Sequence, residues 1–212
     1  MIGRQQTEKI VSWVFYIIGG SGLVVLLLIL FFLFWEGIPI FKEVSFFKFI
    51  LGTYWYPTAD PADFGIFPLI VASLAVTTLA SLIAIPFGVM SAIYLAEVAS
   101  PRIRAIAKPV VELIEGLPTV VIGFFGMVVV APFLQNIFDM PTGLNLFNAS
   151  LMLAFMAVPT IASVSEDAIY SVPSELKEAS LALGASHWET IFKVIIPASL
   201  SGISTAVILG IA

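Results

Sequence analysis

Long runs without a charged residue constrain the fold of this chain more than any other feature. Residues 10–35 contain no Asp, Glu, Lys or Arg, and most of their side chains are aliphatic or aromatic. A helix needs roughly 20 apolar residues to cross the hydrocarbon core of a bilayer. The chain is 60% hydrophobic and 11% charged, which excludes an ordinary soluble domain. The sequence predicts an integral membrane protein with helical spans, since barrel strands are short alternating segments.

Five runs are expected to form spans. They cover residues 10–35, 65–97, 109–133, 149–170 and 198–212. The first follows Arg4 and Lys9 and lacks a cleavage-site pattern, so we interpret it as an uncleaved span. The last has only about 15 residues, fewer than a span requires. We therefore expect an all-α, multi-span helical bundle with six spans in full, of which this sequence contains five, the fifth truncated.

The chain is expected to divide near residue 64. Residues 1–64 would hold the first span and an external segment, whose sequence TYWYPTADPADFG combines interface aromatics with turn residues. Residues 65–212 would form the membrane domain, incomplete at its C-terminus. Within it small residues recur every four positions, a spacing that favours close packing against a neighbouring helix. They are Ala80, Ala84, Gly88, Ala92 and Ala96.

The distribution of basic residues predicts the orientation, because Lys and Arg are enriched in cytoplasmic loops. A cytoplasmic N-terminus places most of them inside, namely Arg4, Lys9, Arg102, Arg104, Lys108, Lys177 and Lys193. Only Lys42 and Lys48 would then lie outside. This orientation also places the polar stretch at residues 173–197 in the cytoplasm.

Residues 173–197 have the pattern of a helical hairpin. Pro173 suits the first turn of a helix, and Gly184 suits its C-terminal cap. Ser186 and Glu189 have the S-x-x-E spacing of a capping box, so a second helix should begin there. On composition alone, this stretch could equally be a solvated cytoplasmic loop.

The stretch EASLALGASHWETIFKVIIP resembles the EAA loop of ABC importer permeases of the binding-protein-dependent type I class. That pattern is E-A-A, three residues, G, nine residues, and I-x-L-P. The matching residues are Glu178, Ala179, Ser180 in place of the second alanine, Gly184, Val194, Ile196 and Pro197. The resemblance implies a coupling helix that docks in a groove of a separate ATPase subunit, and therefore a type I transmembrane domain in residues 65–212.

The resemblance also implies the partners. These are ABC ATPase subunits, a second permease subunit, an external binding protein and membrane lipid in the cell membrane of a prokaryote, with no nucleic acid. The chain contains no G-x-x-x-x-G-K-[ST] sequence, so we expect no ATP binding and no enzymatic activity in this chain. No cofactor or metal is expected, because the single histidine, His187, is interpreted as a surface contact.

Residues 112–127 and 165–186 resemble PstC-type permeases of phosphate transporters, which implies inorganic phosphate as the substrate and a phosphate-binding protein as the external partner. Permeases for molybdate, sulfate or other solutes share the loop and remain alternatives. A membrane scaffold or sensor that does not transport is a further alternative, and an intramembrane enzyme has the least support. No Lys or Arg lies in the middle of a predicted span. In the family, the relevant basic residue follows the point at which this sequence ends.

The third predicted span contains features of a path or a helix gate. Pro118 would free a backbone carbonyl inside the helix, and small residues near it would allow close approach or local opening. The candidates are Gly116, Pro118, Thr119 and Gly123, with simple packing and kinking as the alternative.

The acidic residues near the expected cytoplasmic ends of the spans are interpreted as structural, either ion-paired or solvated. Glu112 and Glu115 are expected to pair with Arg102, Arg104 or Lys108. Glu166 and Asp167 are expected to be solvated.

Overall fold

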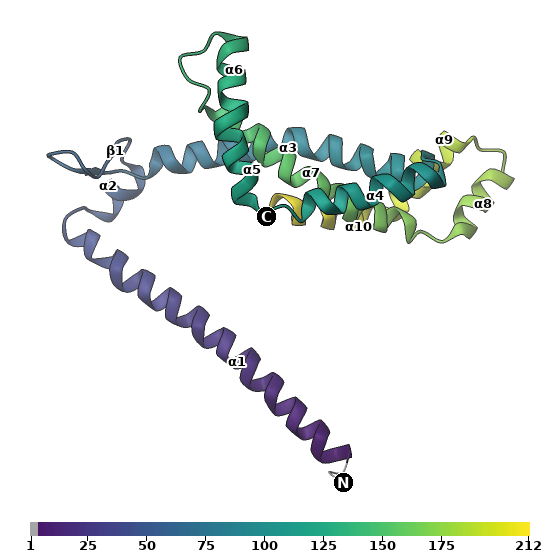
Figure 1. Ribbon diagram of the computed structural model, residues 1–212, viewed down its shortest axis with the longest axis horizontal. Coiled ribbons are helices and arrows are strands. Elements are labelled where there is room, and N and C mark those ends of the chain that lie inside the picture. The colour runs from purple at the N-terminus through teal and green to yellow at the C-terminus, as the bar shows by residue number, and fades with distance from the viewer. Residues whose placement is uncertain (1–3) are drawn as a thin grey trace. The chain divides into compact units, whose positions relative to one another are not determined.

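The computed structural model describes residues 4–212, with side chains from Glu8 onward, and is almost entirely helical (Figure 1). Its contacts divide the chain into two units, one up to Leu69 and one from Ile70 to Ala212. The two units are described separately.

The first unit begins with a long helix, α1 (Arg4–Gly37), whose side chains between residues 10 and 35 are all exposed. A 3₁₀ turn, η1 (Ile38–Lys42), and the short helix α2 (Phe46–Leu51) follow. Two short antiparallel strands, β1 (Trp55–Tyr56) and β2 (Asp63–Phe64), complete the unit. An exposed apolar helix of this length is suited to lipid, which covers the apolar side chains and leaves the backbone bonds satisfied within the helix.

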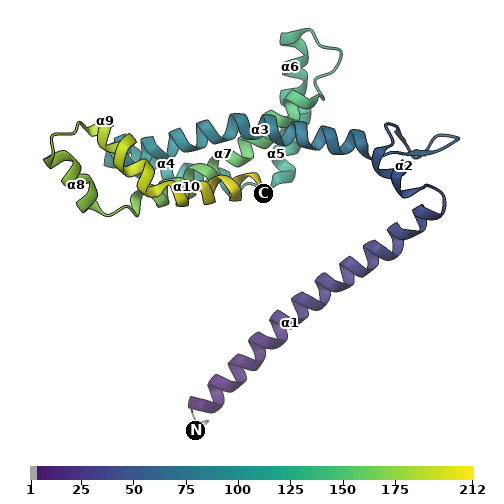
Figure 2. The same cartoon turned by 180° about the vertical axis from the view of Figure 1, so that it is seen from behind.

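The second unit is built from four long segments that run side by side, α3, α4, α7 and α10 (Figures 1 and 2). Its elements are α3 (Phe67–Ile93), η2 (Tyr94–Val98), α4 (Pro101–Glu115), α5 (Thr119–Phe125), η3 (Gly126–Val130), α6 (Ala131–Phe138), α7 (Leu146–Tyr170), α8 (Ser174–Ala182), α9 (His187–Thr190), η4 (Ile191–Ile195) and α10 (Ile196–Ile211). The elements η2, η3 and η4 are π-helical turns.

The core of this unit surrounds α7. Ile161 is fully buried, and a Cβ on Gly88 of α3 would lie 2.6 Å from its Cγ2 atom. A Cβ on Gly210 of α10 would lie 2.4 Å from its Cγ1 atom. The small residues predicted to pack a neighbouring helix are buried at Ala80, Ala84, Gly88 and Ala92. Glycine and alanine therefore allow α3 and α10 to approach α7 closely.

Within residues 4–212, five helices are long and apolar enough to cross a membrane. They are Glu8–Lys42, Phe67–Val98, Thr119–Phe138, Leu146–Tyr170 and His187–Ile211. The all-α, multi-span fold predicted from the sequence is thereby confirmed, although two boundaries differ.

The third span begins at Thr119 rather than at residue 109. Helix α4 ends at Glu115, Gly116 caps it, and Pro118 precedes the first turn of α5. Pro118 therefore lies between two helices, and the prediction that it interrupts a span was wrong. The residue before a proline avoids the helical region, so Leu117 and Pro118 together favour a break over a kink.

The fifth span is longer than expected because its helix begins at His187 and continues past Pro197. Pro197 lies in the first turn of α10, after the π-helical turn η4. A proline in a first turn lacks only an N–H that has no helical partner there. The proline thus marks a change of helix type and leaves the span continuous.

Candidate functional site

The connection between α8 and α9 has the predicted left-handed glycine. Gly184 has φ of +86°, the positive-φ glycine of the described residues. After α8 ends, the N–H of Ala185 donates to the carbonyl oxygen of Ser180 at 3.2 Å. A Cβ on Gly184 would meet nothing within 4 Å. The backbone conformation, and not a lack of space, therefore requires glycine here.

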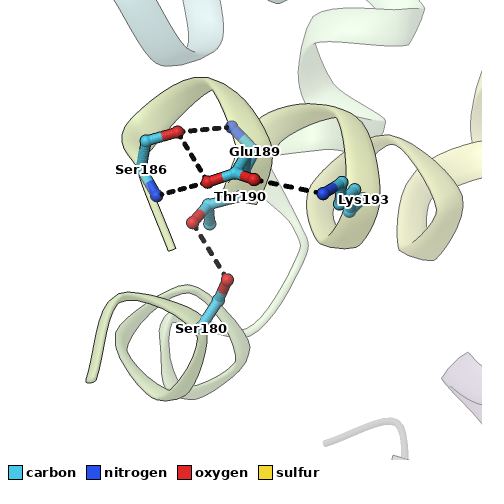
Figure 3. A network of polar contacts seen from close by, with 5 residues as sticks. All are labelled: Ser180, Ser186, Glu189, Thr190 and Lys193. Atoms are coloured by element: carbon cyan, nitrogen blue, oxygen red, sulfur yellow. Dashed lines mark hydrogen bonds and ion pairs between the residues drawn. The ribbon is translucent and has the colours of Figure 1, made fainter. Parts of the chain in front are cut away.

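The predicted capping box starts α9 (Figure 3). The N–H of Glu189 donates to Ser186 Oγ at 3.3 Å, and the N–H of Ser186 donates to Glu189 Oε2 at 3.0 Å. Lys193 Nζ donates to Glu189 Oε1 at 3.1 Å, one turn further along. These bonds satisfy amides that the first turn of a helix leaves without partners.

A hydroxyl pair joins the two helices of the α8–α9 hairpin, which we define as residues 173–190. Ser180 Oγ lies 3.0 Å from Thr190 Oγ1 (Figure 3), and Thr190 is fully buried. Ser180 is the residue that replaces the second alanine of the EAA pattern. Its hydroxyl closes the hairpin, a role that the sequence pattern did not indicate.

The hairpin is attached to the bundle through a residue that sequence reasoning missed. Lys177 Nζ lies 2.5 Å from Glu97 Oε2. His187 Nε2 lies 3.3 Å from the carbonyl oxygen of Glu97, so this ring nitrogen is the donor. Beyond α9, Ile191 and Ile195 are buried in the same apolar cluster as residues of α3, α7 and α10.

The hairpin exposes several large apolar side chains. Leu183 is 90% exposed, and Leu176, Leu181 and Trp188 are also exposed. Glu178 and Ala179 lie on the exposed part of α8. Exposed apolar side chains on a rigid short helix are typical of a surface that docks in a groove of a partner.

The residues of the EAA pattern divide into two groups in the structure. Glu178, Ala179, Ser180 and Gly184 belong to the hairpin. Val194 and Ile196 are partly buried, and Pro197 is exposed, where η4 leads into α10. In the first group Glu178, Ala179 and Gly184 are exposed and Ser180 is half-buried, and the second group forms the start of the following helix.

A cluster of ion pairs joins α4 to α7. Arg104 lies 2.5 Å and Lys108 2.8 Å from the carboxylate of Glu166, and Lys108 lies 2.7 Å from Asp167. The Arg104 guanidinium also lies 4.3 Å from the centre of the Tyr170 ring. Hydrogen bonds with Asp167 and then Glu166 raise the pKa of Lys108, which lies outside the five spans and stays charged.

The acidic residues in this region differ from the sequence-based expectation. Glu166 is 1% exposed and ion-paired rather than solvated, whereas Asp167 is exposed as predicted. Glu112 and Glu115 form no ion pair within the described part of the chain, so their predicted pairing with Arg102, Arg104 or Lys108 was wrong. Arg104 and Lys108 of α4 pair with α7 instead of with the next turn of their own helix.

The residues proposed as a path lie at the break between α4 and α5. Gly116 and Pro118 flank the break, and Thr119 begins α5. Thr119 lines a cavity of about 400 Å³ together with Glu115 and Thr160. Gly123 lines a different cavity, of about 490 Å³. The structure therefore separates residues that the sequence had suggested as one group.

Comparison with known proteins identifies the family. Residues 84–212 match the family described as binding-protein-dependent transport system inner membrane component. The chain belongs to this family. It is therefore a multi-pass member of the ABC importer permease family.

Relatives agree with the family assignment. A probable ABC transporter permease protein, YqgH of Bacillus subtilis, is 42% identical over 80% of this chain and 55% of its own length. The phosphate transport system permease protein PstC of Mesorhizobium japonicum is 31% identical over 84% of this chain and 58% of its own. The chain thus spans under two thirds of the length of these permeases.

A solved structure of the MetNI methionine ABC transporter, in inward-facing conformations, has the same fold. Its TM-score is 0.59 at 24% identity, and the match covers 73% of this chain and 71% of that one. This similarity supports the arrangement of the permease helices.

Proposed function

We propose that this permease subunit belongs to an ATP-driven importer of inorganic phosphate and docks on a separate ATPase through residues 173–197. The α8–α9 hairpin is the observation that carries the proposal. It is held rigid by a capping box and a hydroxyl pair, yet its apolar side chains are exposed. A helix that docks in a groove needs an apolar face and a fixed exit angle.

The hairpin can transmit movement without any covalent chemistry in this chain. Displacement of α8 and α9 by the ATPase would act on α3 through Glu97 and on α10 through the continuous helix after His187. The break at Gly116 to Pro118 is where α5 could turn relative to α4, because a loop residue absorbs backbone rotation more readily than a helix does. Thr119 and Gly123, just after the break, would border the path.

The names of similar proteins support phosphate as the substrate. PstC proteins of Mesorhizobium japonicum and Haemophilus influenzae are 31% and 32% identical to this chain. The complete machine would contain a second permease with a matching loop, two ATPase subunits and an external phosphate-binding protein. The basic residues favour a cytoplasmic N-terminus, which places the hairpin on the side of the ATPase.

Anion competition tests the substrate. The full-length protein would be purified with its co-expressed partners and reconstituted in vesicles, and labelled phosphate uptake would be measured with phosphate, sulfate or molybdate as competitor. Hydrogen phosphate both donates and accepts hydrogen bonds, whereas sulfate only accepts at neutral pH. A site built around a donor and an acceptor rejects the analogue that leaves one buried partner unpaired.

We expect unlabelled phosphate to inhibit uptake strongly and the other anions to have little effect. Equal inhibition by sulfate or molybdate would show that the substrate range extends beyond phosphate. It would leave the permease assignment unchanged. A full-length protein that binds no ATPase subunit would contradict the coupling role and favour a scaffold or sensor.

A further inference from the structure

Glu97 is the point at which the end of α3 meets both helices of the α8–α9 hairpin. It lies in the π-helical turn η2, and its side chain is 10% exposed. The carboxylate pairs with Lys177 of α8, and the backbone carbonyl accepts from His187 of α9. These two contacts join residues separated by 80 and 90 positions in the sequence.

The two helices of the hairpin are held in different ways. The helix that follows α9 is anchored by Ile191 and Ile195, which are buried in an apolar cluster with Ala92 and Ile169. Within the described part of the chain, Lys177 makes the hydrogen bond that joins α8 to a residue outside the hairpin. The Lys177–Glu97 ion pair is therefore the polar side-chain link from α8 to the end of α3, beside the packing of α8 on η4.

The space beside this ion pair is not filled. Glu97 and Lys177 border a cavity of about 360 Å³, whose wall also includes Ile169 and Pro173. Tightly packed interiors resist displacement, whereas a cavity leaves room for a side chain or a helix to shift. The bundle therefore does not pack tightly against α8 beside this ion pair, and the Lys177–Glu97 contact is the polar link there.

We propose that Glu97 is a positioning residue that transmits displacement of α8 to the cytoplasmic end of α3. This inference rests on the proposed function, since it assumes that an ATPase moves the hairpin. A load on α8 reaches α3 through the Lys177–Glu97 ion pair, and a load on α9 reaches the same residue through His187. Breaking the ion pair leaves the docking face intact and removes the link from α8 to Glu97, while the contact of His187 with the Glu97 carbonyl remains.

The experiment compares variants of the full-length protein in its reconstituted complex. Glu97→Gln and Lys177→Met each remove the ion pair, and the double variant Glu97→Lys with Lys177→Glu restores it with reversed polarity. Glu112→Gln is the matched control, because Glu112 is an exposed carboxylate of α4, outside the docking hairpin and without an ion pair among the described residues. The measurements are the amount of ATPase subunit that co-purifies and the phosphate taken up per ATP hydrolysed.

We expect normal ATPase binding in every variant. The two single variants should lower the uptake per ATP at least about fivefold, the lower end of the range for coupled sites. The charge-reversed pair should regain most of the loss, and Glu112→Gln should match the unmodified protein. A purely structural role would lower the amount of assembled complex and leave the ratio unchanged.

Two results would overturn the inference. Unchanged uptake per ATP in both single variants, in a complex that otherwise transports, would show that Glu97 does not transmit the movement. Failure of the unmodified complex to bind the ATPase or to couple hydrolysis to phosphate uptake would contradict the proposed function itself, and the inference with it.

Discussion

At the scale of single residues, Gly184 sets the direction of α9 relative to α8. Its φ of +86° lies in the left-handed region. For residues other than glycine, this conformation costs roughly 1–2 kcal/mol, and β-branched residues tolerate it poorly. Asparagine is the usual exception, because its short polar side chain tolerates this region.

A substitution series at Gly184 should therefore follow backbone preference. We expect Gly184→Val to insert in the membrane but to lose uptake per ATP, and Gly184→Asn to keep most of it. Gly22→Ala in α1 is a suitable control, since a Cβ at Gly22 also meets nothing within 4 Å but its φ is not positive. Normal transport by Gly184→Val would show that this turn does not direct the docking helix.

The residue contacts that could be predicted are those close in sequence. The capping box joins Ser186 and Glu189, three positions apart, and the pattern of residues alone indicates it. The Glu97–Lys177 pair joins residues 80 positions apart. Such a contact depends on how the helices pack, so a single sequence contains no signal for it.

At the scale of elements, the ion-pair cluster holds α4 against α7. Glu166 is 1% exposed between Arg104 and Lys108, whereas its neighbour Asp167 is 66% exposed. Removing one member of a buried pair leaves an uncompensated charge and costs about 3–5 kcal/mol. An exposed ion pair contributes roughly 0–1 kcal/mol.

These two neighbours should thus differ sharply when each is replaced by alanine. We expect Glu166→Ala to lower the free energy of unfolding of the purified full-length protein by about 3 kcal/mol. Asp167→Ala should lower it by less than about 1 kcal/mol. Thermal unfolding in detergent would measure both. Equal effects of the two substitutions would mean that Glu166 is not the centre of the cluster.

Which helices exist was predictable from the long apolar runs, whereas the break in the third run was misjudged. The sequence on both sides of Glu115 predicts one span from residue 109 to 133, with Pro118 inside the helix. In the structure α4 ends at Glu115, and Arg104 and Lys108 of α4 pair with Glu166 of α7. The membrane-spanning helix begins at Thr119.

At the scale of the whole molecule, the orientation in the membrane decides whether the hairpin can reach an ATPase. The chain contains no cysteine, so a single introduced cysteine reports one position without background. Ser186→Cys should react with a membrane-impermeant reagent only from the cytoplasm, and Thr58→Cys only from outside. The opposite pattern at both positions would refute a cytoplasmic N-terminus.

Contact between the hairpin and the ATPase would show directly whether the hairpin docks on that subunit. Leu183 is 90% exposed at the end of α8, so Leu183→Cys in the full-length complex should form a cross-link with a co-expressed ATPase subunit. Thr58→Cys, in the first unit, serves as the control and should form none. The proposed docking predicts a cross-link from position 183 that forms only in the assembled complex. A complex that transports phosphate but gives no cross-link from Leu183 or its exposed neighbours Leu181 and Trp188 would contradict it.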